Sequence, residues 1–170
     1  MGAGDLDSAV SSLRTLIEEF PRSTMVMEGG VSLAEAYLQM DPPKTIEARQ
    51  ALGAVARILR SRPDKEGKAL LDITLGNVAM AEGDPGSALA SWYGVGLTEA
   101  NTPELAELVK EAIELALKEA QRQIKEEGNE NRWNLVIELT EQYLNNFPMA
   151  ANAEELRALN VRAIGLAPEE

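Results

Sequence analysis

The chain has 170 residues, a net charge of −12 at pH 7, and 45% apolar but only 4% aromatic residues. An acidic surface attracts neither nucleic acid nor anionic lipid, so neither is expected as a main partner. Cysteine and histidine are both absent, which excludes disulfides, the usual zinc ligands and a histidine general base. A core of Leu, Ala, Ile and Val favours one domain of close-packed helices.

Apolar residues at helical spacing predict eight helices, separated by turns that contain Gly, Asp or Pro. No apolar run approaches the roughly eighteen residues of a membrane-spanning helix. Gly29 and Gly30 predict an irregular or late start of the second helix, because glycine is a poor helix former. The expected helices are 4–20, 24–40, 45–61, about 64–82, 85–100, 103–127, 132–146 and about 150–165.

The stretch from Leu70 to Val95 is the clearest predicted hairpin. Gly83 can take the left-handed conformation that ends a helix, Asp84 can cap the next helix, and Pro85 suits its first turn. Gly76 removes a side chain from the first arm, which favours a close approach of the second arm.

The turn signals recur at a nearly constant spacing. Helix-ending prolines stand at residues 21, 63, 103 and 148, at intervals of 42, 40 and 45 residues. From Gly4 the offsets to Ala9, Leu13 and Leu16 are five, nine and twelve, the same as those from Gly83 to Ala88, Trp92 and Val95. This period predicts one repeat domain over 1–170, with a half-repeat 4–21, repeats 22–63, 64–102 and 103–148, and a terminal helix 149–166.

Two segments carry a resemblance to a known family. Leu75-Gly76, Gly83-Asp84, Ala88, Trp92 and Val95 resemble the tetratricopeptide repeat, and Leu33-Ala34-Glu35-Ala36-Tyr37 is similar to the first arm of that unit. The resemblance implies an all-α solenoid of antiparallel helix hairpins that forms a right-handed superhelix. The repeats exceed the family's usual length of about 34 residues, and their Phe-Pro endings are similar to those of bacterial envelope scaffold proteins. An envelope or periplasmic location is therefore favoured, with a cytoplasmic one left open.

The same resemblance implies a non-enzymatic scaffold or adaptor, without cofactor or metal, that binds a peptide or partner protein on its concave groove. The first arms line that groove in the family. When positions are counted from each turn signal, the resemblance implies the following groove-lining residues: Glu28, Glu35, Gln39, Ile73, Asn77, Met80, Lys118, Arg122, Lys125 and Arg157.

Lys118, Arg122 and Lys125 are spaced by four and three residues, so they share one helical face. On so acidic a chain, this basic stripe with Arg157 is a candidate clamp for a peptide carboxylate or an acidic motif. The alternative is local pairing along or between helices. The carboxylates within reach for such pairing are Glu114, Glu119, Glu126 and Glu154.

Two other functions stay open. The chain opens at the turn of a hairpin, so it is expected to be a fragment of a longer protein. Exposed apolar faces at the end hairpins could stack on neighbouring copies and make the domain a self-assembly module, a homo-oligomer. Alternatively, the domain is a regulatory or spacer region of that longer protein. Trp92, Tyr93 and Trp133 are interpreted as core or inter-repeat packing residues.

Overall fold

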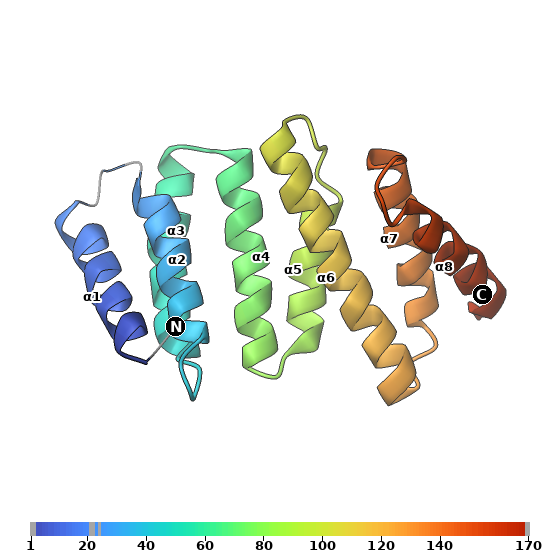
Figure 1. Cartoon of the computed structure of the whole chain (residues 1–170), viewed down its shortest axis with the longest axis horizontal. Helices are drawn as coiled ribbons and strands as arrows, with labels where there is room; N and C mark the ends of the chain where they lie inside the picture. Colours follow the sequence, from blue (N-terminus) through green and yellow to red (C-terminus); the bar gives the residue numbers. More distant parts are fainter. Residues whose placement is uncertain (1–2, 21–22, 24, 169–170) are drawn as a thin grey trace. The chain divides into compact units, whose positions relative to one another are not determined.

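The computed structural model describes the backbone of residues 3–20, 23 and 25–168, with side chains from residue 6 onward in those ranges. This part of the chain is all-α and contains no strand. Figure 1 shows the helices in chain order. They are α1 (Ala3–Glu19), α2 (Met25–Leu38), α3 (Thr45–Ser61), α4 (Lys65–Ala81), α5 (Pro85–Gly96), α6 (Pro103–Glu127), α7 (Arg132–Asn146) and α8 (Ala153–Leu166).

The predicted bounds of α3, α6 and α7 are confirmed to the residue. The predicted start of α8 at Ala150 is wrong by three residues, because the segment after Pro148 forms two successive turns before the helix begins. In these turns the Ala150 N–H donates to the Phe147 carbonyl at 3.1 Å, and the Ala153 N–H donates to the Ala150 carbonyl at 3.0 Å.

The chain divides into two compact units, residues 1–88 and 89–170, and the boundary falls inside α5. In the first unit α2 packs against α1, α3 and α4 (Figure 1). The core of this unit joins α2 to α3 and α4, with small residues between larger aliphatic ones. It consists of Val31, Leu33, Ala34, Tyr37, Ala48, Ala51, Leu52, Val55, Leu71 and Val78.

Gly29 and Gly30 do not delay the second helix, so the prediction of an irregular or late start is wrong. α2 begins before them at Met25, and both glycines are buried within it. A Cβ atom on Gly29 would lie 2.8 Å from Leu16 Cδ2, and one on Gly30 would overlap Val55 Cγ2. The two glycines therefore let α1 and α3 approach the backbone of α2 closely, which outweighs their poor helix propensity.

Capping residues set the ends of α4 as the sequence predicts. Asp64 Oδ2 accepts a hydrogen bond from the Gly67 N–H at 2.6 Å at the start of the helix. Gly83 has φ 77°, the left-handed conformation of a helix C-terminus. Asp84 Oδ1 then accepts from the Ser87 N–H at 3.0 Å and caps α5. Local side-chain chemistry thus places the α4–α5 turn.

In the second unit α6 packs on α7, and α7 packs on α8. Thr102 caps α6 by accepting from the Leu105 N–H at 3.1 Å, and Gly128 ends it with φ 66°. Gly96 brings the end of α5 against α6, since a Cβ there would lie 3.0 Å from Ile113 Cγ1. The main buried residues are Leu105, Val109, Ala112, Ile113, Ala116, Leu117, Ala120, Val136, Leu139, Tyr143, Leu156 and Ala163.

Candidate functional site

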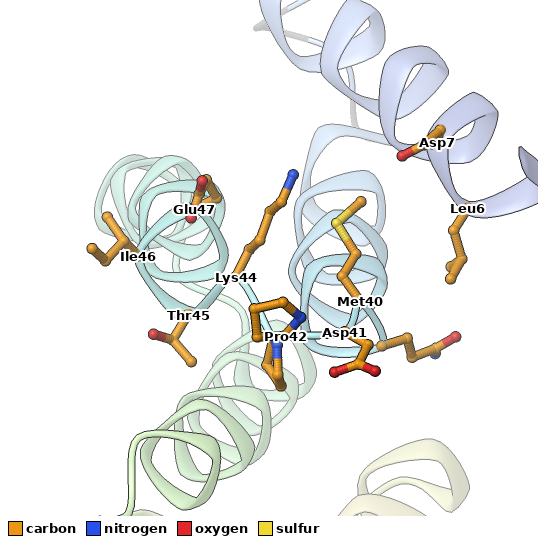
Figure 2. Close-up of a pocket in the computed structure, with 11 residues that line it drawn as sticks. Leu6, Asp7, Met40, Asp41, Pro42, Lys44, Thr45, Ile46 and Glu47 are labelled. Atoms are coloured by element: carbon orange, nitrogen blue, oxygen red, sulfur yellow. The ribbon is translucent and has the colours of Figure 1, made fainter. Parts of the chain in front are cut away.

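A cleft of about 630 Å³ opens in the first unit where the α2–α3 loop passes α1. Figure 2 shows Leu6 and Asp7 of α1 on one side of this loop and Ile46 and Glu47 of α3 on the other. The side chain of Lys44 extends between the helices in the same view. The cleft is lined by Leu6, Asp7, Gln39, Met40, Asp41, Pro42, Pro43, Lys44, Thr45, Ile46 and Glu47.

Two smaller hollows, of about 300 and 250 Å³, continue from this cleft between α1 and α3. Glu47 lines both the cleft and the first hollow, while Ile17, Ala54 and Arg57 line both hollows. The shared residues place the three hollows in a row along α3, and together they are here named the α1–α3 groove. Beyond the cleft it comprises Arg14, Ile17 and Glu18 of α1; Val26, Leu33 and Tyr37 of α2; and Gln50, Ala51, Ala54, Arg57 and Ile58 of α3.

The packing of α2 explains the depth of the groove. α1 and α3 each pack on α2, and Gly29 and Gly30 draw both of them close to it. The floor consists of α2 side chains such as Leu33 and Tyr37, which are almost fully buried. On the α3 wall, Ala51 and Ala54 are too short to fill the space above this floor. The result is a trough between two helical walls, and its aliphatic surface comes from half-buried side chains such as Ile17 and Ile58.

Charge is unevenly distributed along the groove. The cleft end carries Asp7, Asp41 and Glu47 against one cation, Lys44. At the other end Arg14 forms an ion pair with Glu18 at 3.4 Å, so Arg57 is the remaining cation of this end. Arg57 Nε donates to the Gly53 carbonyl at 3.3 Å, and within the described residues its guanidinium enters no ion pair. The groove is therefore acidic at the cleft end and basic at the Arg57 end.

The first-arm residues that the sequence nominated in this unit lie in different environments. Glu28 and Glu35 are exposed on α2, and Gln39 is exposed in the turn that follows it. Gln39 also lines the cleft of the α1–α3 groove. In α4, Asn77 and Met80 are half-buried, while Ile73 is only 3% exposed and has little side-chain surface to offer a partner. The concave-face site over α2 and α4 stays a prediction.

The predicted basic stripe on α6 places Lys118 and Lys125 on the surface, with Arg122 between them and half-buried. Arg122 Nε donates to Glu119 Oε2 at 2.8 Å, and Arg122 Nη2 donates to Glu119 Oε1 at 2.7 Å. It also pairs with Glu126 at 3.1 Å and Glu127 at 2.8 Å. These carboxylates raise the pKa of Arg122 above its usual value, the Glu119 hydrogen bond first. The contacts of Arg122 thus match the local-pairing alternative.

Glu119 is the buried centre of a polar chain. It is 4% exposed, and its Oε1 also accepts from Gln123 Nε2 at 2.9 Å. Gln123 Oε1 in turn accepts from Arg132 Nε of α7 at 2.7 Å. The hydrogen bonds from Arg122 hold the pKa of the Glu119 carboxyl below its usual range, against the opposing effect of burial. The network joins the end of α6 to the start of α7.

Arg157, the last of the nominated cations, is exposed on α8, and its Nη2 donates to the Pro148 carbonyl at 3.0 Å. It therefore ties α8 to the turn that precedes it. Trp92 is buried, Trp133 is half-buried with the Arg162 guanidinium 6.0 Å from its ring centroid, and Tyr93 donates its hydroxyl to Glu138 at 2.9 Å. These three aromatic residues occupy packing positions, as the sequence indicates.

Sequence reasoning missed the α1–α3 groove, since it placed the binding surface on the first arms. The only nominated residue in the groove is Gln39. One available signal was the three short residues Ala51, Gly53 and Ala54 on α3, at the flank of its apolar stripe. The charged residues Asp7, Glu47 and Arg57 gave no comparable signal, because each stands alone in the sequence.

The described residues contain no group of three or more acidic, cysteine or histidine side chains placed to hold a metal ion. None of the helices in the described ranges combines the length and the apolar character that crossing a bilayer requires. A scan against protein-family models found no match, and neither did searches of curated proteins and of solved structures.

Proposed function

We propose that the chain is a non-enzymatic scaffold that binds a segment of a partner protein in the α1–α3 groove. The observation that carries this proposal is the groove itself, in which half-buried aliphatic side chains such as Ile17 and Ile58 lie between two charged helical walls. Specific binding sites are typically concave, mostly apolar and bordered by a few polar groups. The tetratricopeptide-like pattern of the sequence supports the same class of function.

The test begins with a library of displayed peptides selected against the whole chain. Enriched peptides are then mapped on the protein by amide NMR shifts. We expect the shifted residues to cluster along α1, the α2–α3 loop and α3. Enriched peptides that map elsewhere, or the absence of any enrichment, would contradict the proposal.

Two variants probe the groove directly. Ala54→Trp fills the trough, and Gln50→Trp narrows it from a position that is already exposed. Each should weaken binding of the selected peptides by about tenfold or more, because a large side chain occupies the space of the ligand. Ala81→Trp, on the exposed end of α4, is the matched control and should leave binding unchanged. Circular dichroism verifies that all three variants are folded.

A second candidate is self-association through the outward face of α8. Val161 is 71% exposed, Ile164 is 57% exposed and Leu166 is 47% exposed. Exposed apolar residues that gather on one helix are typical of association surfaces. Light scattering over a concentration series should then detect a growing assembly that Val161→Asp abolishes. A monomer at every concentration would exclude this second function.

A further inference from the structure

The length and walls of the α1–α3 groove fit a helical ligand. Along α3 the lining runs from Ile46 to Ile58, which at about 1.5 Å per residue is roughly 18 Å, or three helical turns. Both walls are helices, whose backbone groups are already hydrogen-bonded internally. An extended ligand would therefore find no main-chain partners on them, whereas a helix satisfies its own backbone groups.

The side chains along the groove match one face of such a helix. Half-buried aliphatic side chains such as Ile17 and Ile58 line the groove together with the short Ala54. An amphipathic helix presents apolar residues at intervals of three and four, and short wall residues allow its axis to approach. The half-buried Met40, Ile17 and Ile58 thus offer aliphatic contacts along the groove to the apolar face of such a helix.

Charge then sets the direction of the ligand. Asp7, Asp41 and Glu47 line the cleft end together with Lys44 (Figure 2), and none of these four residues enters an ion pair within the described residues, so this end carries a net negative charge. Arg57 lies at the other end of the groove, and its guanidinium enters no ion pair within the described residues. The N-terminus of a helix carries positive partial charge and its C-terminus carries negative partial charge. Both ends of the groove therefore favour a ligand helix whose N-terminus lies at the cleft.

We propose that the groove binds an amphipathic α-helix of about three turns from a partner protein, with a Lys or Arg in its first turn beside Asp7, Asp41 and Glu47 and a carboxylate in its last turn beside Arg57. This inference rests on the proposed function, because it names the class and the orientation of the ligand in the same groove. Its charge order is the reverse of the usual one in isolated helices, which prefer acidic residues first.

The probes are two synthetic peptides of identical composition, each with an acetylated N-terminus, an amidated C-terminus and the same aliphatic stripe. One carries two lysines in its first turn and two glutamates in its last turn, and the other carries them in the reverse order. The acidic-first peptide is the better isolated helix. A preference for the basic-first peptide therefore cannot arise from helix propensity.

We expect the basic-first peptide to bind the whole chain about tenfold more tightly by fluorescence polarisation, with a ratio that shrinks at high salt. The triple variant Asp7→Lys, Glu47→Lys, Arg57→Glu should invert the preference. Glu28→Lys with Arg60→Glu changes charges on exposed positions of α2 and α3 outside the groove and should preserve it. Amide NMR shifts of the bound protein place the peptide.

The outcomes separate the two proposals. Equal binding of both peptides in the groove would overturn the orientation and leave the scaffold function standing. Failure of both peptides to bind, while library-selected peptides still map to the groove, would overturn the helical ligand alone. Selected peptides that map to another surface would overturn the scaffold function and this inference together.

Discussion

The α1–α3 groove of the first unit and the end of α6 in the second unit differ in how far their charged residues are paired. In residues 89–170, Glu119, Gln123 and Arg132 form one connected chain of hydrogen bonds between α6 and α7. In residues 1–88 the carboxylates and the arginine along the α1–α3 groove enter few such contacts. Polar groups that are satisfied internally fix a packing arrangement, while unpaired groups along a groove remain available to a partner. This difference supports the proposal that recognition lies in the first unit.

A second polar network strengthens the contrast. The Tyr143 hydroxyl donates to Asn152 Oδ1 at 2.7 Å, and it lies 3.2 Å from Glu114 Oε1. Asn160 Nδ2 of α8 donates to Thr140 Oγ1 of α7 at 2.7 Å. Among the described residues, no buried side-chain nitrogen or oxygen lacks a hydrogen-bond partner. The second unit is thus tied together by specific polar contacts in addition to its aliphatic core.

The largest expected effect comes from breaking the first unit at Gly30. In Gly30→Leu the new side chain must enter space that Val55 occupies, so α2 and α3 have to separate. We expect the free energy of unfolding to fall by about 3 kcal/mol, because overpacking of a close helix contact is costly. Urea unfolding followed by circular dichroism measures this change.

Gly53→Leu is the control for that experiment. A Cβ atom on Gly53 of α3 meets nothing within 4 Å, so the same substitution is accommodated there. It should stabilise the chain by up to about 1 kcal/mol, because leucine is a better helix former than glycine. An equal loss of stability in both variants would show that the close approach of α3 to Gly30 does not account for the packing of α3 on α2.

A smaller effect is expected in the second unit. Glu119→Gln weakens the charge-assisted hydrogen bonds from Arg122, and should cost about 1–2 kcal/mol at neutral pH. Because Arg122 lowers the folded-state pKa of Glu119, the ionised carboxyl contributes stability above its unfolded pKa of about 4.3. That contribution is lost as the pH falls through the lower folded-state value.

Urea unfolding of the wild type and of Glu119→Gln at a series of pH values checks this dependence. The difference between the two should be largest near neutral pH and should shrink steadily in acid. Glu111→Gln, an exposed carboxylate on the same helix, should show almost no difference from the wild type at any pH. A difference for Glu119→Gln that persists unchanged in acid would assign the loss to altered packing.

The smallest effect is expected at the exposed link between α3 and α4. Arg49 Nη2 pairs with Glu82 Oε2 at 2.5 Å, and Arg49 Nε lies 2.8 Å from Glu82 Oε1. Solvent screens both groups, so Arg49→Gln should cost only about 0.5 kcal/mol at low salt and less at high salt. A double-mutant cycle with Glu82→Gln measures the pair, and Arg60→Gln is the exposed control. A coupling free energy above about 2 kcal/mol between Arg49 and Glu82 would show that charged residues of this unit also contribute strongly to its stability.

The sequence predicted the helices well wherever local chemistry marks their ends. α6 lies between the Thr102 cap and the left-handed Gly128, and its bounds were predicted exactly. Gly29 and Gly30 misled the prediction because helix propensity is local, whereas their contacts with Leu16 and Val55 join three different helices. The right-handed superhelix depends on how successive repeats follow one another and stays a prediction.

The candidate site was harder to predict than the fold. The groove brings Asp7 of α1 and Glu47 of α3 to one cleft across forty residues of chain, and its depth depends on how α2 packs beneath them. The basic stripe shows the opposite case. The spacing of Lys118, Arg122 and Lys125 correctly placed them on one helix, and the carboxylates that engage Arg122 were visible within five residues of it.

The positions of Trp92 and Trp133 have a spectroscopic consequence. The chain has two tryptophans, and both belong to residues 89–170. Intrinsic tryptophan emission therefore originates entirely from the unit with the internal polar networks, while circular dichroism registers the helices of both units. Coincident unfolding curves from the two signals would mean that the chain melts as one cooperative body. A circular dichroism change that precedes the emission change would mean that the groove-bearing unit opens first, and the unmodified protein would report it without any added dye.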